Sequence, residues 1–358
     1  MTRPGAEARR AVLLMAYGGP GSLAEVEPFL RDVRGGRETP PELIEEVRAR
    51  YRAIGGGSPI LERTREQAAA LERRLNRRAA AAEGEGKGKG KLGEWRVFVG
   101  MRHWRPFIRE AVAEVVAGGF DTLVGLCLTP QESRMSVGAY FRALEEALDS
   151  PPPPRPSRSS AASGDAGSRG GAPELIRVRS WHDHPGFVAA VAEEVLAALE
   201  RFPAGERAGV EVVFTAHSLP EAILREGDPY DRQVRQTAAT VAGAVAATTG
   251  RALSRSDALT SGWHVAYQSA GARPEPWLGP SLDEVMTRLA GEGHRRFLVA
   301  PVGFVSDHVE VLYDLDVEAQ ARARELSVHL ERTESLNASP AFIEALAGIV
   351  LSAVAAAE

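Results

Sequence analysis

The chain has 358 residues, which is too long for one ordinary α/β core and therefore predicts two domains. Hydrophobic residues make up 44% and charged residues 25% of it, as in ordinary soluble globular proteins, and the net charge of −5 gives no argument for a nucleic-acid partner. The single cysteine, Cys127, excludes an internal disulfide, a cysteine zinc site and a cysteine-bound iron–sulfur cluster. We expect Cys127 to be a buried core residue, and any metal would need His, carboxylate or Tyr ligands.

Targeting and membrane signals are weak in this sequence. The apolar run 11–16 follows Arg3, Arg9 and Arg10, but six apolar residues are too few for the core of a signal peptide. We also expect no stretch to reach the apolar length of a membrane span. These features predict a cytoplasmic protein.

A buried strand at 11–16 opens the predicted fold and runs straight into Tyr17 and the glycine-rich turn 18–22. The turn resembles a phosphate-binding loop only weakly, because the dinucleotide fingerprint GxGxxG and the P-loop pattern GxxxxGK[ST] are both missing. Tyr17 is more informative, because ligands of open α/β sheets bind at the carboxyl ends of the strands.

Helices are predicted next at 22–33, 41–53 and 61–81. The second of these is followed by Gly55, Gly56 and Gly57, which precede Ser58. Three glycines would allow a flat or bulky ligand to approach the backbone closely, although a flexible helix cap and loop would use glycine equally well.

Strands and helices alternate along the rest of the chain. Helices are predicted between the strands and at 339–356, and the strands themselves at 94–101, 122–129, 175–180, 210–216, 264–268, 296–302 and 326–330. This alternation predicts parallel sheets with helices on both faces. Two segments of low complexity, 83–93 and 150–173, are predicted to be surface inserts.

His217 directly follows the strongest predicted strand, 210–216. A lone histidine is more often structural than functional. Its place at the carboxyl end of a buried strand favours a role as a metal ligand or as a base near neutral pH.

Four acidic residues recur at steps of three and four along a helix predicted from residue 307: Asp307, Glu310, Asp314 and Glu318. This spacing places them on one face, where like charges destabilise a helix by about 0.2–0.5 kcal/mol per pair. With His308 beside it, the row indicates a path for a cation or for protons. The alternative is an ordinary solvated acidic face, and Asp307 with Glu310 also fits a helix-capping box.

Arginines and aromatic residues gather near the predicted loop mouths of the first half. They are Arg34, Arg37, Arg50, Arg52, Arg102 and Arg105, with Tyr17, Tyr51, Trp104 and Tyr140. Guanidinium groups bind carboxylates through paired hydrogen bonds, so the set favours a flat, apolar ligand with acidic substituents. The alternative is that a chain with 43 basic residues places arginine everywhere.

Several longer motifs make the chain resemble the ferrochelatase family along almost its whole length, apart from the two inserts. They are MAYGGP (15–20), YRAIGGGSP (51–59), TAHSLP (215–220), GDPY (227–230), YQSAG (267–271), PWLGP (276–280) and PVGFVSDHVEVLYDLD (301–316). The resemblance implies the insertion of Fe²⁺ into a porphyrin. It also implies two similar Rossmann-like lobes, each a parallel four-stranded sheet flanked by helices, with a porphyrin cleft between them.

On this resemblance we expect one lobe to comprise residues 1–120 with the C-terminal helix 333–358, and the other to comprise residues 121–332. The expected partners are a porphyrin and Fe²⁺, with the iron as a substrate. We expect no tightly bound cofactor, no iron–sulfur cluster, no nucleic acid and no membrane span, in a chain that is a monomer.

Carried over residue by residue, the resemblance implies roles for individual side chains. His217 and Glu310 would be the metal-site pair, and Asp314 and Glu318 would continue the acidic row behind them as catalytic groups. The substrate contacts would be Tyr17, Arg34, Arg50, Tyr51, Ser58, His103 and Tyr140.

Tyr17 bears on which porphyrin is used. Ferrochelatases that act on coproporphyrin III typically carry Tyr in this first loop, where it can ligate iron in the product. Arg34 and Arg50 agree with a substrate that has four propionates. Coproporphyrin III is therefore the expected substrate and protoporphyrin IX the alternative, while Glu132 departs from the aromatic or small residue expected beside the pocket.

Two other hypotheses remain open at this point. One is a chelatase of the same fold that inserts cobalt or nickel into a sirohydrochlorin-type ring, against which Tyr17 argues. The other is a non-catalytic carrier of haem or metal, against which the missing signal peptide argues.

Overall fold

The structure is a computed structural model that describes residues 9–84, 93–150, 172–250, 254–255, 262–271 and 274–358. Nearly all of the two predicted inserts lies outside these residues. At the edge of the first insert, helix α3 (Ile60–Gly84) continues three residues past its predicted end at residue 81.

The first sheet contains four parallel strands in the order β2-β1-β3-β4. Their bounds are β1 Arg10–Ala16, β2 Trp95–Met101, β3 Thr122–Cys127 and β4 Glu174–Val178. The interior of β1 is fully buried from Ala11 to Met15, as a continuous apolar run in a parallel sheet requires. The register pairs Ala16 with Met101, so that Tyr17 lies beside the residues that follow β2.

The second sheet is also parallel and has the strand order β6-β7-β5-β8-β9. Its strands are β5 Glu211–His217, β6 Ser254–Arg255, β7 Gly262–Gln268, β8 Arg296–Pro301 and β9 His329–Arg332. The predicted fold class is confirmed, and the second sheet adds the two-residue strand β6 to the four strands expected. Here the register pairs His217 with Gln268 at the carboxyl edge.

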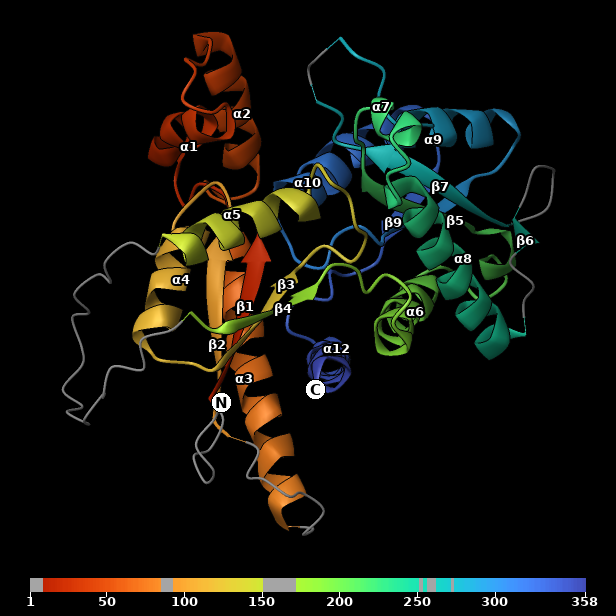
Figure 1. Cartoon of the computed structure of the whole chain (residues 1–358). Coiled ribbons are helices and arrows are strands. Elements are labelled where there is room, and N and C mark those ends of the chain that lie inside the picture. Colours follow the sequence, from red (N-terminus) through yellow and green to blue (C-terminus); the bar gives the residue numbers. More distant parts are fainter. Residues whose placement is uncertain (1–8, 85–92, 151–171, 251–253, 256–261, 272–273) are drawn as a thin grey trace.

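The helices cover the sheets and their connections (Figure 1). They are α1 Val26–Val33, α2 Pro41–Ala53, α4 Ile108–Ala117, α5 Val137–Asp149, α6 Pro185–Leu199, α7 Ala222–Arg225, α8 Tyr230–Thr249, α9 Leu282–Gly291, α10 Val309–Leu312, α11 Gln320–Glu325 and α12 Pro340–Ala357. Helices α1 and α2 stand beyond the carboxyl end of β1 (Figure 1). The single helix predicted from residue 307 is instead α10, a π-helix at Asp314–Ala319 and α11.

The expected lobe boundary at residue 120 passes through the first sheet, because β3 and β4 pair with β1 and with each other. The chain crosses to the second sheet only after β4. The apolar core is also continuous between the halves, since Val12 of β1 and Phe214 of β5 belong to one buried cluster. Helix α12 packs against both α3 and α6, and it therefore joins the halves as well.

Contrary to expectation, one helix in the described part of the chain is long and apolar enough to cross a membrane by length and composition, namely Pro340–Ala357. This stretch is α12, and Phe342, Leu346 and Val350 on its inner face are fully buried in the core. The expectation for Cys127 is confirmed, since the residue is 1% exposed within the first sheet.

Candidate functional site

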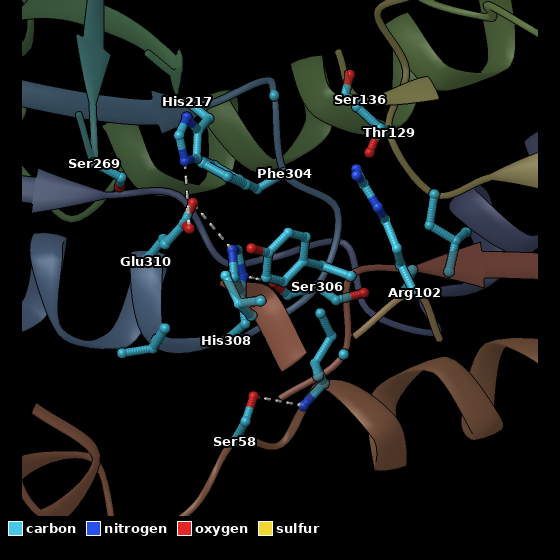
Figure 2. A pocket seen from close by; sticks show the side chains of 18 of the residues that line it. Ser58, Arg102, Thr129, Ser136, His217, Ser269, Phe304, Ser306, His308 and Glu310 are labelled. Atoms are coloured by element: carbon cyan, nitrogen blue, oxygen red, sulfur yellow. Dashed lines mark hydrogen bonds and ion pairs between the residues drawn. The ribbon is translucent and has the colours of Figure 1, made fainter. Parts of the chain in front are cut away.

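A cavity of about 500 Å³ lies between the carboxyl ends of the two sheets. That volume is in the range of sites for organic ligands and cofactors. Eight of the residues predicted for the site line it: Tyr17, Arg50, Tyr51, Ser58, Tyr140, His217, Glu310 and Asp314. Figure 2 shows part of this lining, with residues from both halves of the chain.

His217 and Glu310 face each other inside this cavity (Figure 2), with 3.6 Å between His217 Nε2 and Glu310 Oε1. The Nδ1 atom of His217 contacts the carbonyl oxygen of Ser218, which can only accept a hydrogen bond, so Nδ1 carries a proton. The lone pair of the neutral ring is therefore on Nε2, toward Glu310. About a third of each side chain is open to the cavity, 34% for His217 and 28% for Glu310.

His308 completes the surroundings of Glu310 from the other side. Its Nδ1 donates to the carbonyl oxygen of Ser306 at 2.8 Å, and its Nε2 lies 3.8 Å from Glu310 Oε2. Burial lowers the pKa of His308, but the interaction with Glu310 outweighs it and the net pKa is raised. Burial likewise raises the pKa of Glu310, and the two histidines reverse this, so its net pKa lies below the usual range. Glu310 is therefore a carboxylate at neutral pH.

Asp314 is the second acidic residue of the predicted row that lines the cavity. Its Oδ2 accepts a hydrogen bond from the hydroxyl of Ser269, which follows β7. Burial, followed by the charges of Glu310 and Glu318, raises the pKa of Asp314 to about 6. Asp314 can therefore take up and release a proton close to neutral pH.

The two ends of the predicted acidic row lie away from the cavity lining. Glu318 is exposed on the surface of the π-helix, while still close enough to affect the pKa of Asp314. Asp307 accepts a hydrogen bond from Asn337 Nδ2 at 2.9 Å and lies 3.7 Å from Arg63, so it ties α3 to the segment before α12. The row therefore runs from the cavity at Glu310 to solvent at Glu318.

Among the described residues no group of three or more His, Cys, Asp or Glu side chains is arranged to hold a metal ion. His217 and Glu310 offer an imidazole and a carboxylate, which suit Fe²⁺ and equally Zn²⁺ or Co²⁺. Two protein ligands leave a metal ion under-coordinated, which suits an ion that is bound briefly and passed on.

Tyr17 presents an exposed ring, 41% accessible, at the end of β1. The centroid of the Tyr17 ring is 4.7 Å from that of the His103 ring. The Nδ1 atom of His103 lies 2.9 Å from Asp32 Oδ1. Burial, followed by the charge of Glu310, raises the pKa of Tyr17 to about 12. His103 therefore contacts Tyr17 without lining the cavity itself, and burial lowers the pKa of His103.

The arginines separate into two groups. Arg50 and Arg102 line the cavity, and each guanidinium lies over an aromatic ring, Tyr313 at 5.5 Å and Tyr140 at 5.8 Å. Arg34, which the resemblance placed among the substrate contacts, directly follows the last residue of α1 and is not part of the lining. The cationic part of the lining is therefore Arg50 with Arg102.

The three glycines after α2 are explained by the backbone conformation and close packing of their loop, and not by an open surface for a ligand. Gly55 and Gly56 adopt φ values of +103° and +99°, which other residues rarely adopt. A Cβ atom on Gly57 would lie 2.5 Å from the carbonyl oxygen of Gly21, so two chain segments meet there. The loop in turn brings Ser58 to the cavity.

The sequence analysis gave no site role to several lining residues, among them Tyr230, Ser269 and Ser306. Tyr230 was visible in the motif GDPY. The serines carry no signal of their own, because only the path of the loops brings them to the cavity.

Comparison with known proteins agrees with this geometry. A sequence model of the family described as Ferrochelatase matches residues 9–354. The chain is 40% identical over 346 residues to the protein named Ferrochelatase in Thermus thermophilus, covering 96% of this chain and 98% of that protein. It is 37% identical over 339 residues to the Ferrochelatase of Deinococcus radiodurans, covering 95% and 94%.

A third relative, from Geobacillus kaustophilus, is named Coproporphyrin III ferrochelatase. It is 37% identical to this chain over 341 residues, which cover 95% of this chain and 94% of the relative. The family match over nearly the whole chain and these identities agree with the parallel sheets and the shared cavity. The chain belongs to the ferrochelatase family, the metal chelatases that insert a metal ion into a porphyrin.

Proposed function

We propose that the chain inserts Fe²⁺ into coproporphyrin III. The observation that carries this proposal is the pairing, in one cavity, of an exposed Tyr17 from the first half with His217 and Glu310 from the second. Arg50 and Arg102 supply positive charge at the same cavity, which suits the propionates of the ring. The relative named Coproporphyrin III ferrochelatase supports the same choice of ring.

The chemistry follows from charge balance. A free-base porphyrin carries two N–H protons at its centre, and both must leave when Fe²⁺ binds the four nitrogens. We assign the first proton acceptor to His217 Nε2, the basic atom that faces the cavity beside Glu310. The negative charge of Glu310 stabilises the imidazolium that forms.

The acidic row offers a route for the protons to leave the cavity. Asp314, whose pKa is raised to about 6, can carry a proton near neutral pH. Glu318 is exposed and can pass it to water. Glu310 and the lone pair of His217 Nε2 can also hold Fe²⁺, and because Nε2 has only one lone pair, it accepts a proton once the ion has left it for the ring.

The proposal also covers the cofactors, the oligomeric state and the cellular location. Fe²⁺ enters as a substrate and leaves in the product, and the enzyme works without a tightly bound cofactor or iron–sulfur cluster. We further propose that the chain acts as a monomer in the cytoplasm.

The proposal is tested by anaerobic turnover with coproporphyrin III and protoporphyrin IX side by side, followed by absorbance. We expect many turnovers per protein, with kcat/KM for coproporphyrin III at least about tenfold higher, since added propionate contacts stabilise the bound ring. Preference for protoporphyrin IX would contradict the choice of ring. Failure to turn over either porphyrin more than once would contradict catalysis and favour a carrier.

A further inference from the structure

Asp228, in the motif GDPY, takes no part in the chemistry proposed above, yet its carboxylate is nearly buried at 8% exposure. Its Oδ2 accepts hydrogen bonds from Ser133 Oγ at 3.0 Å and from the backbone N–H of Arg134 at 2.8 Å. Its Oδ1 accepts from the backbone N–H of Tyr230 at 3.0 Å. Ser133 and Arg134 belong to the loop that joins β3 to α5, whereas Tyr230 begins α8. The carboxylate therefore joins the two halves of the molecule.

The same loop is fastened to α8 at further points. Gln131 Nε2 donates to Thr237 Oγ1 and to the carbonyl oxygen of Val302, both at 3.1 Å. The N–H of Glu132 donates to Gln233 Oε1 at 2.6 Å. Gln233 and Thr237 are four residues apart and share one helix face. These hydrogen bonds fix the position of the β3–α5 loop relative to α8. Asp228 supplies the charged side chain among these contacts, and we call it the anchor of the loop.

Both sides of this anchor reach the cavity. On the loop side, Met135 and Ser136 come directly after the anchored segment and line the cavity (Figure 2 labels Ser136). On the helix side, the Tyr230 hydroxyl donates to the carbonyl oxygen of His217 at 2.9 Å. Asp228 therefore lies between a wall of the ring site and the residue that carries the basic nitrogen.

We propose that Asp228 is a positioning residue that fixes the distance between the Met135–Ser136 wall and His217, and so sets how tightly the porphyrin is held. The inference rests on the proposed function, because it takes the cavity as the ring site. A carboxylate is required at this position because its three partners are all donors. An asparagine would offer one oxygen and turn an N–H₂ donor toward the remaining donors.

The test compares three variants in steady-state turnover with the porphyrin that the wild-type protein accepts. Asp228→Asn should raise KM for the porphyrin about tenfold while kcat stays within about threefold, because displacement of the wall weakens ring binding more than the chemical step. Ser133→Ala removes one loop donor to Asp228, and with it the acceptor of the Met135 N–H at 3.1 Å, and should raise KM in the same direction by a smaller factor. Titration of the porphyrin without iron should show the same rise in Kd.

Asp231→Asn is the matched control. Asp231 lies three residues away, accepts from the Tyr267 hydroxyl at 2.6 Å and pairs with Arg235, without a contact to the β3–α5 loop. Its KM and Kd for the porphyrin should stay at the wild-type values. Asp228 would be merely structural if both aspartate variants changed the melting temperature or kcat by the same amount and Asp228→Asn did not raise KM.

Unchanged KM and Kd in both Asp228→Asn and Ser133→Ala would overturn the inference. If Asp228→Asn does not fold, Ser133→Ala decides alone, because it removes only one hydroxyl. If the wild-type protein turns over porphyrin and the variants keep its KM and Kd, the positioning role is refuted and the proposed function is not. A wild-type protein that inserts no iron would refute both.

Discussion

Two regions of the molecule meet in the cavity with the same architecture and different chemistry. The first wall, at the carboxyl end of the first sheet, is aromatic and cationic, with Tyr17, Arg50, Tyr51, Arg102 and Tyr140. The second wall, at the end of the second sheet, is made of groups that bind cations and protons, namely His217, His308, Glu310 and Asp314. Two similar parallel sheets have thus placed unlike side chains at equivalent edges. On the proposed function, the first wall holds the ring and the second wall handles the ions.

The largest effect should come from the second wall. His217→Ala removes the basic nitrogen beside Glu310 and should lower kcat at least about 10²-fold, the range of a lost acid–base group. The melting temperature should change little, because His217 is a third exposed and lies at the end of β5. Anaerobic turnover and a thermal melt measure both, and near-normal turnover would end the proposed role.

A matching change in the first wall should act on binding. Arg50→Ala removes one of the two cavity arginines and should raise KM for the porphyrin about tenfold, a typical loss for a charge-assisted hydrogen bond, with kcat nearly unchanged. Arg52→Ala, on the same helix and outside the lining, is the control and should leave KM unchanged. A fall in kcat for Arg50→Ala at constant KM would contradict the proposal that the first wall binds the ring and the second wall handles the ions.

Asp314→Asn should have a smaller effect on rate, about three- to tenfold, because Asp314 receives protons after the first acceptor. Its pKa of about 6 lies above the ordinary value, so the folded protein holds this proton more tightly than the unfolded chain. Asp314 therefore makes stability fall as the pH rises from about 4 to about 6, and the variant should lose that part of the pH dependence. Thermal melts between pH 4 and pH 7 test this, and unchanged pH dependence would contradict the assignment.

The smallest effect on rate should follow Tyr17→Phe, which keeps the ring that packs against His103 in a tilted arrangement. Turnover should stay within about threefold, since no proton acceptor is lost. The visible spectrum of the bound ferric product should change, because the variant cannot supply a phenolate ligand. Identical spectra in the wild-type protein and the variant would remove Tyr17 as a ligand and weaken the case for coproporphyrin III.

Much of the fold could be predicted because buried parallel strands are continuous apolar runs. The prediction 210–216 matches Glu211–His217 within one residue. The lobe boundary could not be predicted in the same way, since the pairing of β3 with β1 depends on contacts between segments more than a hundred residues apart. The π-helix at Asp314–Ala319 also has no sequence signature, because its acidic spacing fits an α-helix equally well.

The cavity lining was predictable where a side chain lies at the carboxyl end of a strand, as Tyr17 after β1 and His217 at the end of β5 do. It was less predictable on loops and helix ends. Arg34 and His103 are sequence neighbours of the lining residues Val33 and Arg102, yet neither of them lines the cavity. Side-chain direction in such segments depends on the path of the loop, which residue types and spacing do not determine.

The division between the walls is tested most directly by Glu310→Gln, measured for porphyrin affinity without iron and for kcat with iron. The substitution keeps the shape of the side chain and removes the charge that faces His217 and His308. We predict a porphyrin Kd within about threefold of the wild-type value and a kcat lower by about 10²-fold. A variant that loses porphyrin binding in proportion to its loss of rate, or that keeps its full rate, would contradict the account.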